Sequence, residues 1–253
     1  MDAANTQPPL RPAAKYEIRL PKRKRPGEPD HYRLSAARLA APPTKPPPTR
    51  PVHPHLLNLH LRPCRVAGFL SHCFNPPPAF IQSWARRIFP EWFLPDHIVL
   101  KSQKQGVDEL EEKGLFDTEV KAYSRLKPLQ GVVIPKFYGL CYHGGARALI
   151  LEHLPGVSLL SPEGSTLTLE ELSALLQPAY RALQAFGVQH DDPHMGNFQL
   201  VDGRMMVLDL ERVAFDLSED DMAHFLKTSV EELADRYRSM QAYHRRHGSL
   251  EAA

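Results

Sequence analysis

The chain has 253 residues, a length that allows one medium domain or a small domain with a long unstructured arm. Of the 25 prolines, 19 lie in the first 100 residues, whereas 12 of the 14 glycines lie after residue 100. This division excludes a wholly disordered chain and predicts a disordered part joined to a folded part. No stretch approaches the roughly 20 apolar residues of a membrane span, and no apolar signal region is present, so we expect a soluble protein of the cytoplasm or nucleus.

Charge is divided as unevenly as proline. Residues 1–60 carry 11 Lys and Arg against 4 Asp and Glu, a net charge of +7, and the remaining residues carry 20 against 25, a net charge of −5. The basic character therefore belongs to the N-terminal arm and is no argument for nucleic-acid binding by the folded part. The cysteines, Cys64, Cys73 and Cys141, are odd in number and widely spaced, which predicts free thiols.

Residues 1–55 are predicted to form a disordered, proline-rich basic tail. Repeated prolines favour extended polyproline conformations, and the segment has no apolar periodicity that could offset the entropy cost of ordering it. The run from Pro21 to Pro26 reads PKRKRP, a pattern that nuclear import receptors bind or that phosphate polyanions attract. The alternative is a run of charges that only solvates the tail.

Residues 56–95 are predicted to form a docking or linker segment, because apolar residues return there. The large apolar residues that recur at helical spacing are Phe80, Ile81, Trp84 and Ile88. Arg86 and Arg87 lie on the opposite side of such a helix. We expect this helix to dock on the following domain, with contact to a membrane surface or a partner as the alternative.

A short hairpin is the most informative feature of the C-terminal half. Residues 198–201 and 205–208 are apolar strands joined at Asp202 and Gly203, a strong turn signal. The hairpin brings Asn197, just before its first strand, close to Asp209, just after its second. Asp192 precedes Asn197 by five residues and can approach the same place. Two carboxylates and an amide oxygen suit Mg²⁺ that is also bound by substrate phosphates.

The same residues, with His190 ahead of them, match the kinase pattern H-x-D-x-x-x-x-N followed by a metal-binding Asp after a hairpin. The sequence here resembles the protein-kinase-like superfamily. Its His-x-Asp-x-His-x-Gly-Asn form is more similar to the aminoglycoside and choline phosphotransferase branch, and to compact fungal kinase-like proteins, than to ordinary Ser/Thr kinases. The resemblance implies an ATP- and Mg²⁺-dependent enzyme that transfers the γ-phosphoryl group to a hydroxyl of an unknown small molecule or protein.

The resemblance also implies a role for each residue of the segment. Asp192 would orient or deprotonate the acceptor hydroxyl, and His190 would brace the loop. Asn197 would bind Mg²⁺, and Asp209 would bridge Mg²⁺ to the β- and γ-phosphates. Asp191 is the weaker candidate for the base, because only Asp192 has the matching offset to Asn197. A solvated acidic turn beside a hairpin is the alternative.

A kinase small lobe needs a strand Lys for the α- and β-phosphates and a helix Glu that holds this Lys. Residues 98–101 are an apolar run that ends in Lys101. Asp117 is expected to cap a helix over residues 118–126, in which Glu119 shares one face with apolar residues. Lys101 and Glu119 are therefore expected to pair. An exposed Lys and a solvated Glu are the alternative.

Two further elements are expected between this helix and the catalytic loop. Residues 137–142 and 148–151 predict a hairpin, followed by a linker whose backbone at Glu152, His153 and Leu154 would contact the adenine of ATP. A capping box then predicts the start of a helix that ends at Gly187 and buries one apolar stripe. The residues of this box and stripe are Thr168 and Glu171, and Leu169, Leu172, Leu176, Ala179, Leu183 and Phe186.

The resemblance fails in three places. Residues 69–105 contain no glycine, so the glycine-rich loop that covers phosphates in kinases is missing or remodelled. Leu210 and Glu211 follow Asp209 where Phe-Gly is typical of protein kinases, and Glu211 is either a further metal-side acid or structural. The last residues predict one helix, capped by Ser218 and Asp221, which leaves no room for a peptide platform.

The sequence thus predicts an α+β, two-lobed protein-kinase-like fold with a minimal C-terminal lobe, preceded by the disordered tail. The small lobe would span residues 96–154 and the large lobe residues 155–253. The main alternative to an active phosphotransferase is a weak or inactive pseudokinase that acts as a nucleotide-binding or protein-interaction module. A third hypothesis is a nuclear protein whose basic tail binds nucleic acid, which would show as steep salt dependence.

Overall fold

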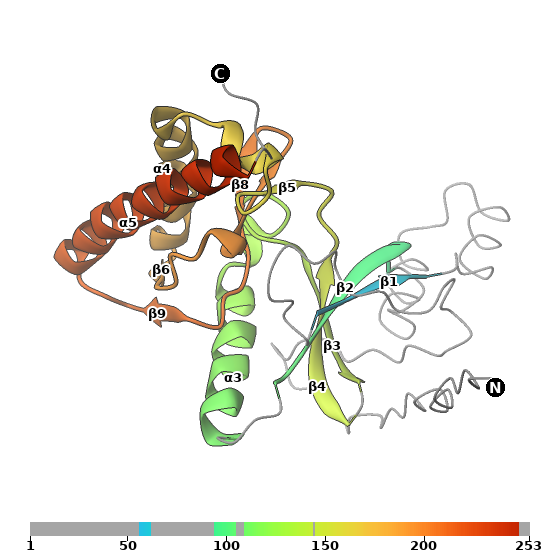
Figure 1. Cartoon of the computed structure of the whole chain (residues 1–253). Coiled ribbons are helices and arrows are strands. Elements are labelled where there is room, and N and C mark those ends of the chain that lie inside the picture. The colour runs from blue at the N-terminus through green and yellow to red at the C-terminus, as the bar shows by residue number, and fades with distance from the viewer. Residues whose placement is uncertain (1–55, 62–93, 105–108, 144, 248–253) are drawn as a thin grey trace, which may run out of the picture.

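The computed structural model describes residues 56–61, 94–104, 109–143 and 145–247 (Figure 1). These residues form an α+β fold with antiparallel sheets and three α-helices, in agreement with the α+β part of the predicted fold class. Within the described residues, no helix combines the length and the apolar character needed to cross a membrane. The predicted tail, its basic run and the helix around Trp84 lie outside the described residues.

A four-stranded antiparallel sheet occupies the N-terminal half of the described chain (Figure 1). Its strands, in spatial order, are β1 (Leu56–His60), β2 (His97–Ser102), β4 (Ala146–Glu152) and β3 (Phe137–His143). The predicted hairpin of β3 and β4 is confirmed, as is the strand that carries Lys101. The strand β1 was not predicted. It pairs with β2 in the register Leu57↔Leu100 and so extends the sheet into the segment expected to be a linker.

Helix α3 (Glu109–Arg125) packs beside this sheet, where the rings of Tyr123 and Phe137 stack at 5.3 Å (Figure 1). The prediction that Asp117 caps the helix is wrong. The helix begins at Glu109, because the residues before Asp117 include the helix formers Glu, Leu and Lys, which extend the pattern upstream. Asp117 instead bonds Arg147 of β4 at 2.6 Å. A short 3₁₀ helix, η3 (Lys127–Leu129), follows.

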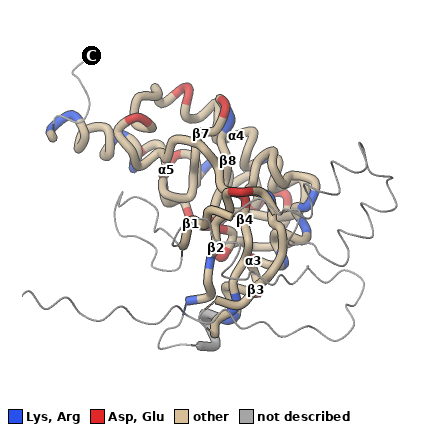
Figure 2. Tube along the Cα trace, turned by 90° about the vertical axis from the view of Figure 1, so that its right-hand side faces the viewer, with Lys and Arg blue, Asp and Glu red and all other residues tan. Residues whose placement is uncertain are grey.

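Helices α4 (Leu169–Gln184) and α5 (Glu219–Arg246) lie together in the C-terminal half (Figure 1). The capping box of Thr168 and Glu171 is present as predicted, and Ser218 accepts a hydrogen bond from the backbone of Asp221 at the start of α5. Acidic residues occupy the first turn of α5 and basic residues its last turn, an arrangement that favours the helix dipole (Figure 2).

Short strands and turns connect these helices. The predicted hairpin is formed by β7 (Phe198–Val201) and β8 (Arg204–Val207), with Asp202 and Gly203 both at positive φ in its turn. The remaining pieces are β5 (Val157–Ser158), which pairs with β7, η4 (Glu163–Thr166), η5 (Met195–Asn197), and β6 (Val188–His190), which pairs with β9 (Val213–Phe215).

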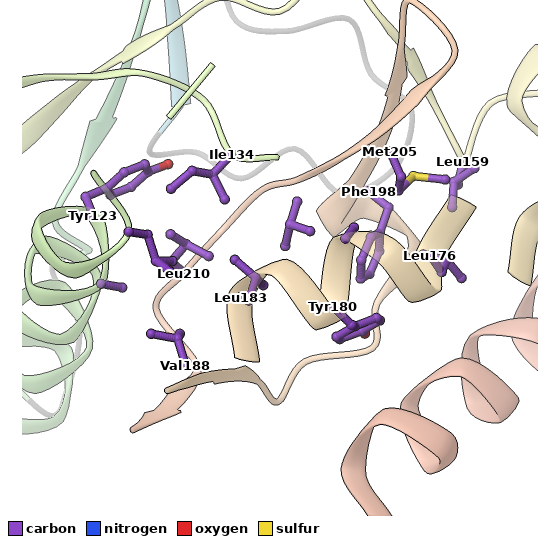
Figure 3. Packing of buried hydrophobic residues seen from close by; sticks show 14 of the residues in the cluster. Tyr123, Ile134, Leu159, Leu176, Tyr180, Leu183, Val188, Phe198, Met205 and Leu210 are labelled. Carbon is purple, nitrogen blue, oxygen red and sulfur yellow. The ribbon is translucent and has the colours of Figure 1, made fainter. Parts of the chain in front are cut away.

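One hydrophobic core joins the two halves. It includes Tyr123 of α3, Leu183 of α4 and Phe198 of β7, all fully buried (Figure 3). Leu149 of β4 is fully buried in the same core. Leu210, directly after Asp209, belongs to the same core. A smaller cluster covers the other face of the sheet and includes Leu59, Ile98, Leu100 and Ile150. Because the larger core is continuous, it fixes α3 and the segment after β8 against the sheet.

Candidate active site

Lys101 of β2 is the centre of a buried group of charges. Its side chain is 8% exposed, and its Nζ donates to Glu119 Oε1 of α3 at 3.0 Å and to Asp209 Oδ1 at 2.8 Å. Glu211 Oε1 lies 3.2 Å from the same nitrogen. We call Lys101, Glu119, Asp209 and Glu211 the ion cluster. Residues 18 and 108 positions away from Lys101 thus meet at one nitrogen, and the predicted pairing of Lys101 with Glu119 is present.

Glu119 joins α3 to both other parts of the cluster. Its Oε1 also accepts the backbone N–H of Leu210 at 3.3 Å. Its Oε2 lies 2.9 Å from Lys101 Nζ but has no well-aligned hydrogen bond among the described residues, so its interaction is an ion pair. Burial raises the pKa of Glu119 to about 7, and the nearby Lys101 limits this rise. The prediction that Glu119 lies on the apolar face of its helix is confirmed. Ala122, Tyr123 and Leu126, which share this face, are fully buried, as is Glu119.

Asp209 has a backbone conformation that few residues adopt. Its φ is +55°, in the left-handed region that Asp tolerates better than most side chains. Its carbonyl oxygen accepts from His190 Nε2 at 3.1 Å, and its Oδ1 accepts from the backbone N–H of Glu211 at 3.3 Å. Burial alone would raise the pKa of Asp209, but the Lys101 ammonium outweighs burial and holds this pKa below its usual value. Asp209 is therefore an ionised carboxylate in a fixed orientation.

Lys104 is a site residue that the sequence reasoning missed. Its Nζ lies 2.6 Å from Glu211 Oε2, so Glu211 bridges Lys104 and Lys101. The only local signal for Lys104 is its position three residues after Lys101. It lies just beyond the end of β2, where the alternation of strand side chains no longer predicts to which face of the sheet a side chain points. Glu211 was considered as a metal-side acid or a structural residue. Its two ion pairs place it in the cluster.

The ion cluster has the charges of a metal site and of an anion site. Carboxylate oxygens of Glu119, Asp209 and Glu211 lie within 4.8 Å of one another, close enough to share one divalent cation. Burial lowers the pKa of Lys101, but the three carboxylates more than offset burial and raise this pKa above its usual value. Lys101 is therefore a permanent cation beside three acids.

Asp192 and Asn197 form a second group, on the loop of residues 191–197, which we call the Asp192 loop. Asn197 Nδ2 donates to Asp192 Oδ2 at 3.0 Å and to its carbonyl oxygen at 3.3 Å. The backbone N–H of Leu208 donates to the Asn197 carbonyl oxygen at 2.7 Å, which ties the loop to the strand leading to Asp209. Asn197 is buried, Asp192 is half-buried and Asp191 is exposed. The structure thus distinguishes the two aspartates in the way that the spacing predicts.

His190 links the two groups. It is fully buried, with its ring at the edges of Tyr180 and Phe198. Burial lowers its pKa, which favours the neutral ring, and because its partner at Asp209 is a carbonyl oxygen, Nε2 must carry the proton. His190 therefore supports the backbone of Asp209, and its predicted role in bracing the Asp192 loop stays a prediction.

The residues predicted to contact adenine lie elsewhere, at the end of β4. The Glu152 carboxylate bonds Lys136 Nζ at 2.8 Å and the Lys136 backbone N–H at 3.1 Å. The Leu154 carbonyl oxygen accepts from Gln199 of β7 at 3.2 Å. His153 lies near His97. These contacts fix the linker between the sheet and the hairpin, but they do not join it to the ion cluster.

Comparison of the chain with protein-family models finds no matching family, and comparison with curated proteins finds no match either.

Proposed function

We propose that the chain is an Mg²⁺-ATP-dependent phosphotransferase with a two-lobed protein-kinase-like fold and a minimal C-terminal lobe. The acceptor would be a hydroxyl of a small molecule or a protein. One observation carries the proposal: Lys101 Nζ contacts Glu119 Oε1 at 3.0 Å and Asp209 Oδ1 at 2.8 Å. An ammonium from a strand, held by a helix carboxylate beside a second carboxylate that follows a hairpin, is the arrangement that kinases use at the nucleotide phosphates.

The donor set fits a magnesium ion held with phosphates. Asp209 and Glu211 are less buried than Glu119 and would supply oxygen ligands, as would Asn197, whose amide nitrogen is directed to Asp192. Glu119 would keep its place on Lys101. When bound, Mg²⁺ would neutralise the negative charge that develops on the phosphate oxygens. Lys101 and Lys104 would bind phosphate oxygens. Lys104 would take the place of the glycine-rich loop that covers the phosphates in kinases, since residues 69–105 contain no glycine.

Asp192 would act on the acceptor. Its Oδ2 accepts from Asn197, which fixes the carboxylate, and its half-buried position leaves it accessible to a hydroxyl. Orientation of that hydroxyl, and removal of its proton, contribute about 10²- to 10⁴-fold to such reactions. The backbone at Glu152, His153 and Leu154 would hold the adenine. In this arrangement catalysis depends mainly on positioning and on charge compensation.

A pseudokinase that binds nucleotide or a partner without turnover is the second candidate. It is favoured by the ion pairs of Lys101, whose charge is already matched by three carboxylates. A nucleotide must displace at least part of this pairing before Lys101 can bind phosphate. Binding without phosphoryl transfer would therefore support the second candidate over the enzyme.

Thermal unfolding of the purified chain with ATP and Mg²⁺, compared with ATP and a chelator, tests the nucleotide site. We expect the midpoint to rise only when both ATP and Mg²⁺ are present, because ligands of the native state stabilise it. Asp209→Asn should lose this rise. Asp220→Asn, an exposed substitution of the same kind at the start of α5, is the matched control and should retain it. An unchanged rise in Asp209→Asn would show that the ion cluster is not the metal site.

Formation of ADP from ATP, measured with and without hydroxyl acceptors, tests turnover, and the phosphorylated acceptor is the second product to be detected. The turnover rate of Asp192→Asn should be about 10²- to 10⁴-fold lower than that of the unmodified chain. The rate of Asp191→Asn should be unchanged, since only Asp192 is held by Asn197. Equal rates for the two variants would refute the role of Asp192. Nucleotide binding without measurable turnover in the unmodified chain would establish the second candidate.

A further inference from the structure

Three histidines outside the ion cluster lie in one row across the sheet. His60 ends β1 and is the direct partner of His97, the first residue of β2. The pairing of Ile98 with Glu152, continued by one residue, places His97 opposite His153, directly after β4. Directly paired residues of adjacent strands point to the same face of a sheet. The register alone therefore brings three imidazoles from three separate segments to one edge of the fold.

The three imidazole rings lie close together, as this register predicts. The ring centroids of His60 and His97 are 4.2 Å apart, and those of His97 and His153 are 6.0 Å apart. Two imidazoles bound to one tetrahedral zinc ion at Zn–N of about 2.0–2.1 Å have centroids roughly 5 Å apart. The two separations lie on either side of this value. The ring nitrogens of the three residues do not all lie within 4.8 Å of one another, so binding of one ion would require rotation about side-chain bonds.

The three imidazole rings are accessible to a cation. His60 and His97 are exposed and His153 is partly buried, and among the described residues no hydrogen bond engages the ring nitrogens of these three histidines.

We propose that His60, His97 and His153 bind a divalent transition-metal ion of the zinc type, with the remaining position open to water. Imidazole nitrogen is a preferred ligand of Zn²⁺, Cu²⁺ and Ni²⁺, and Mg²⁺ prefers oxygen. The ion would join β1 to β2 and to the linker after β4, so it would fix an edge strand that has one strand neighbour in the described sheet. Binding free energy of this kind stabilises the folded state.

The histidine row is separate from the proposed phosphate site, and it shares with the proposed adenine site only His153, through its side chain instead of its backbone. His97 and Lys101 lie four residues apart on β2, which corresponds to about 13 Å along a strand. Failure of phosphoryl transfer would therefore leave the histidine site intact, and failure of the histidine site would leave the ion cluster intact. Asp209→Asn serves to separate the two, since it should still bind the transition metal.

The test uses the full chain after removal of metals with a chelator, in an excess of Mg²⁺ that occupies oxygen sites. Titration with Zn²⁺ is followed by calorimetry, and titration with Co²⁺ by the visible absorption of nitrogen-ligated cobalt. His97→Asn removes the central ligand, and His224→Asn, an exposed histidine of α5, is the matched control. Because loss of a partner outside the ligand shell already costs about 10- to 100-fold, we expect His97→Asn to weaken Zn²⁺ binding at least about 100-fold.

The expected result is one site in the unmodified chain, a loss in His97→Asn and no change in His224→Asn. Equal affinity of the unmodified chain and His97→Asn, or no binding by either, would overturn the proposal. If His97→Asn fails to fold, as judged by its circular dichroism, His60→Asn provides the same test on the neighbouring strand. Unchanged Zn²⁺ affinity in a folded His60→Asn would overturn the proposal as well.

Discussion

The ion cluster and the Asp192 loop differ in what holds their polar groups. In the ion cluster, a nearly buried ammonium is in contact with three carboxylates, and the groups come from a strand, a helix and a segment after a hairpin. In the Asp192 loop, Asn197 bonds an aspartate five residues before it, and that aspartate is half-buried. The first arrangement depends on the whole fold, and the second depends mainly on a local turn.

Because of this difference, substitutions in the ion cluster and in the Asp192 loop should have different effects on stability and on the reaction. Buried charges are tolerated only when they are paired, so removal of one member of the cluster leaves the others without compensation. A half-buried hydrogen bond between near neighbours contributes little to stability. We therefore expect substitutions in the cluster to affect folding and binding together, and substitutions of Asp192 to affect the reaction alone.

Lys101→Met should have the largest effect on stability. Breaking a buried ion pair by removing one partner costs about 3–5 kcal/mol, because the remaining charges stay buried and unpaired. Three carboxylates are left in this case. Urea unfolding at pH 8 measures the change. Lys136→Met removes a lysine that is about half exposed and paired with Glu152, and should cost less than about 1 kcal/mol. Similar losses in the two variants would contradict the comparison.

His190→Leu should have the next largest effect, since it removes the support of Asp209 without removing a charge. The Asp209 carbonyl oxygen would lose its bond to Nε2, and a buried polar group left without a partner costs about 1–3 kcal/mol. His190→Gln can place a donor near the position of Nε2 and should restore part of the loss. Urea unfolding of both variants is the measurement, and equal losses would show that the bond to Asp209 is unimportant.

Glu119 predicts a dependence of stability on pH. Burial raises the pKa of Glu119 from 4.5 to about 7 in the folded state. Between these pH values the folded state binds a proton that the unfolded state has lost, so the stabilisation from this group is complete below pH 4.5 and is lost as pH rises through 7. Glu119→Gln removes this titration. The free energy of unfolding should fall less steeply over this pH range in Glu119→Gln than in the unmodified chain, and parallel curves would contradict the assignment.

Local patterns in the sequence predicted the elements that carry the site. The turn at Asp202 and Gly203 defined the hairpin because it needs residues that tolerate positive φ. The helical-face rule identified Glu119 because a carboxylate among buried apolar residues needs a cation. In each case a few neighbouring residues contain the physical cause.

Two of the features that were missed, β1 and Lys104, depend on distant residues. β1 is a five-residue strand after a proline-rich segment, and it forms by pairing with β2 about 40 residues later, as in Leu57↔Leu100. Lys104 joins the cluster through Glu211, 107 residues away. The start of α3 was misplaced because Asp is a cap signal only where the upstream residues do not themselves favour a helix. No local pattern in the sequence predicts the pairing of β1 with β2 or the ion pair of Lys104 with Glu211.

Asp192→Asn should have the smallest effect on stability and so tests the comparison most sharply. Its Oδ2 accepts a single side-chain hydrogen bond, from Asn197, and the amide oxygen of asparagine can accept the same bond. The half-buried position also reduces the cost of changing its charge. We expect the free energy of unfolding to change by less than about 0.5 kcal/mol, as for ordinary surface substitutions. A loss as large as that of His190→Leu would show that the Asp192 loop is part of the folded framework, and any fall in phosphoryl transfer would then no longer identify Asp192 as the group that acts on the acceptor.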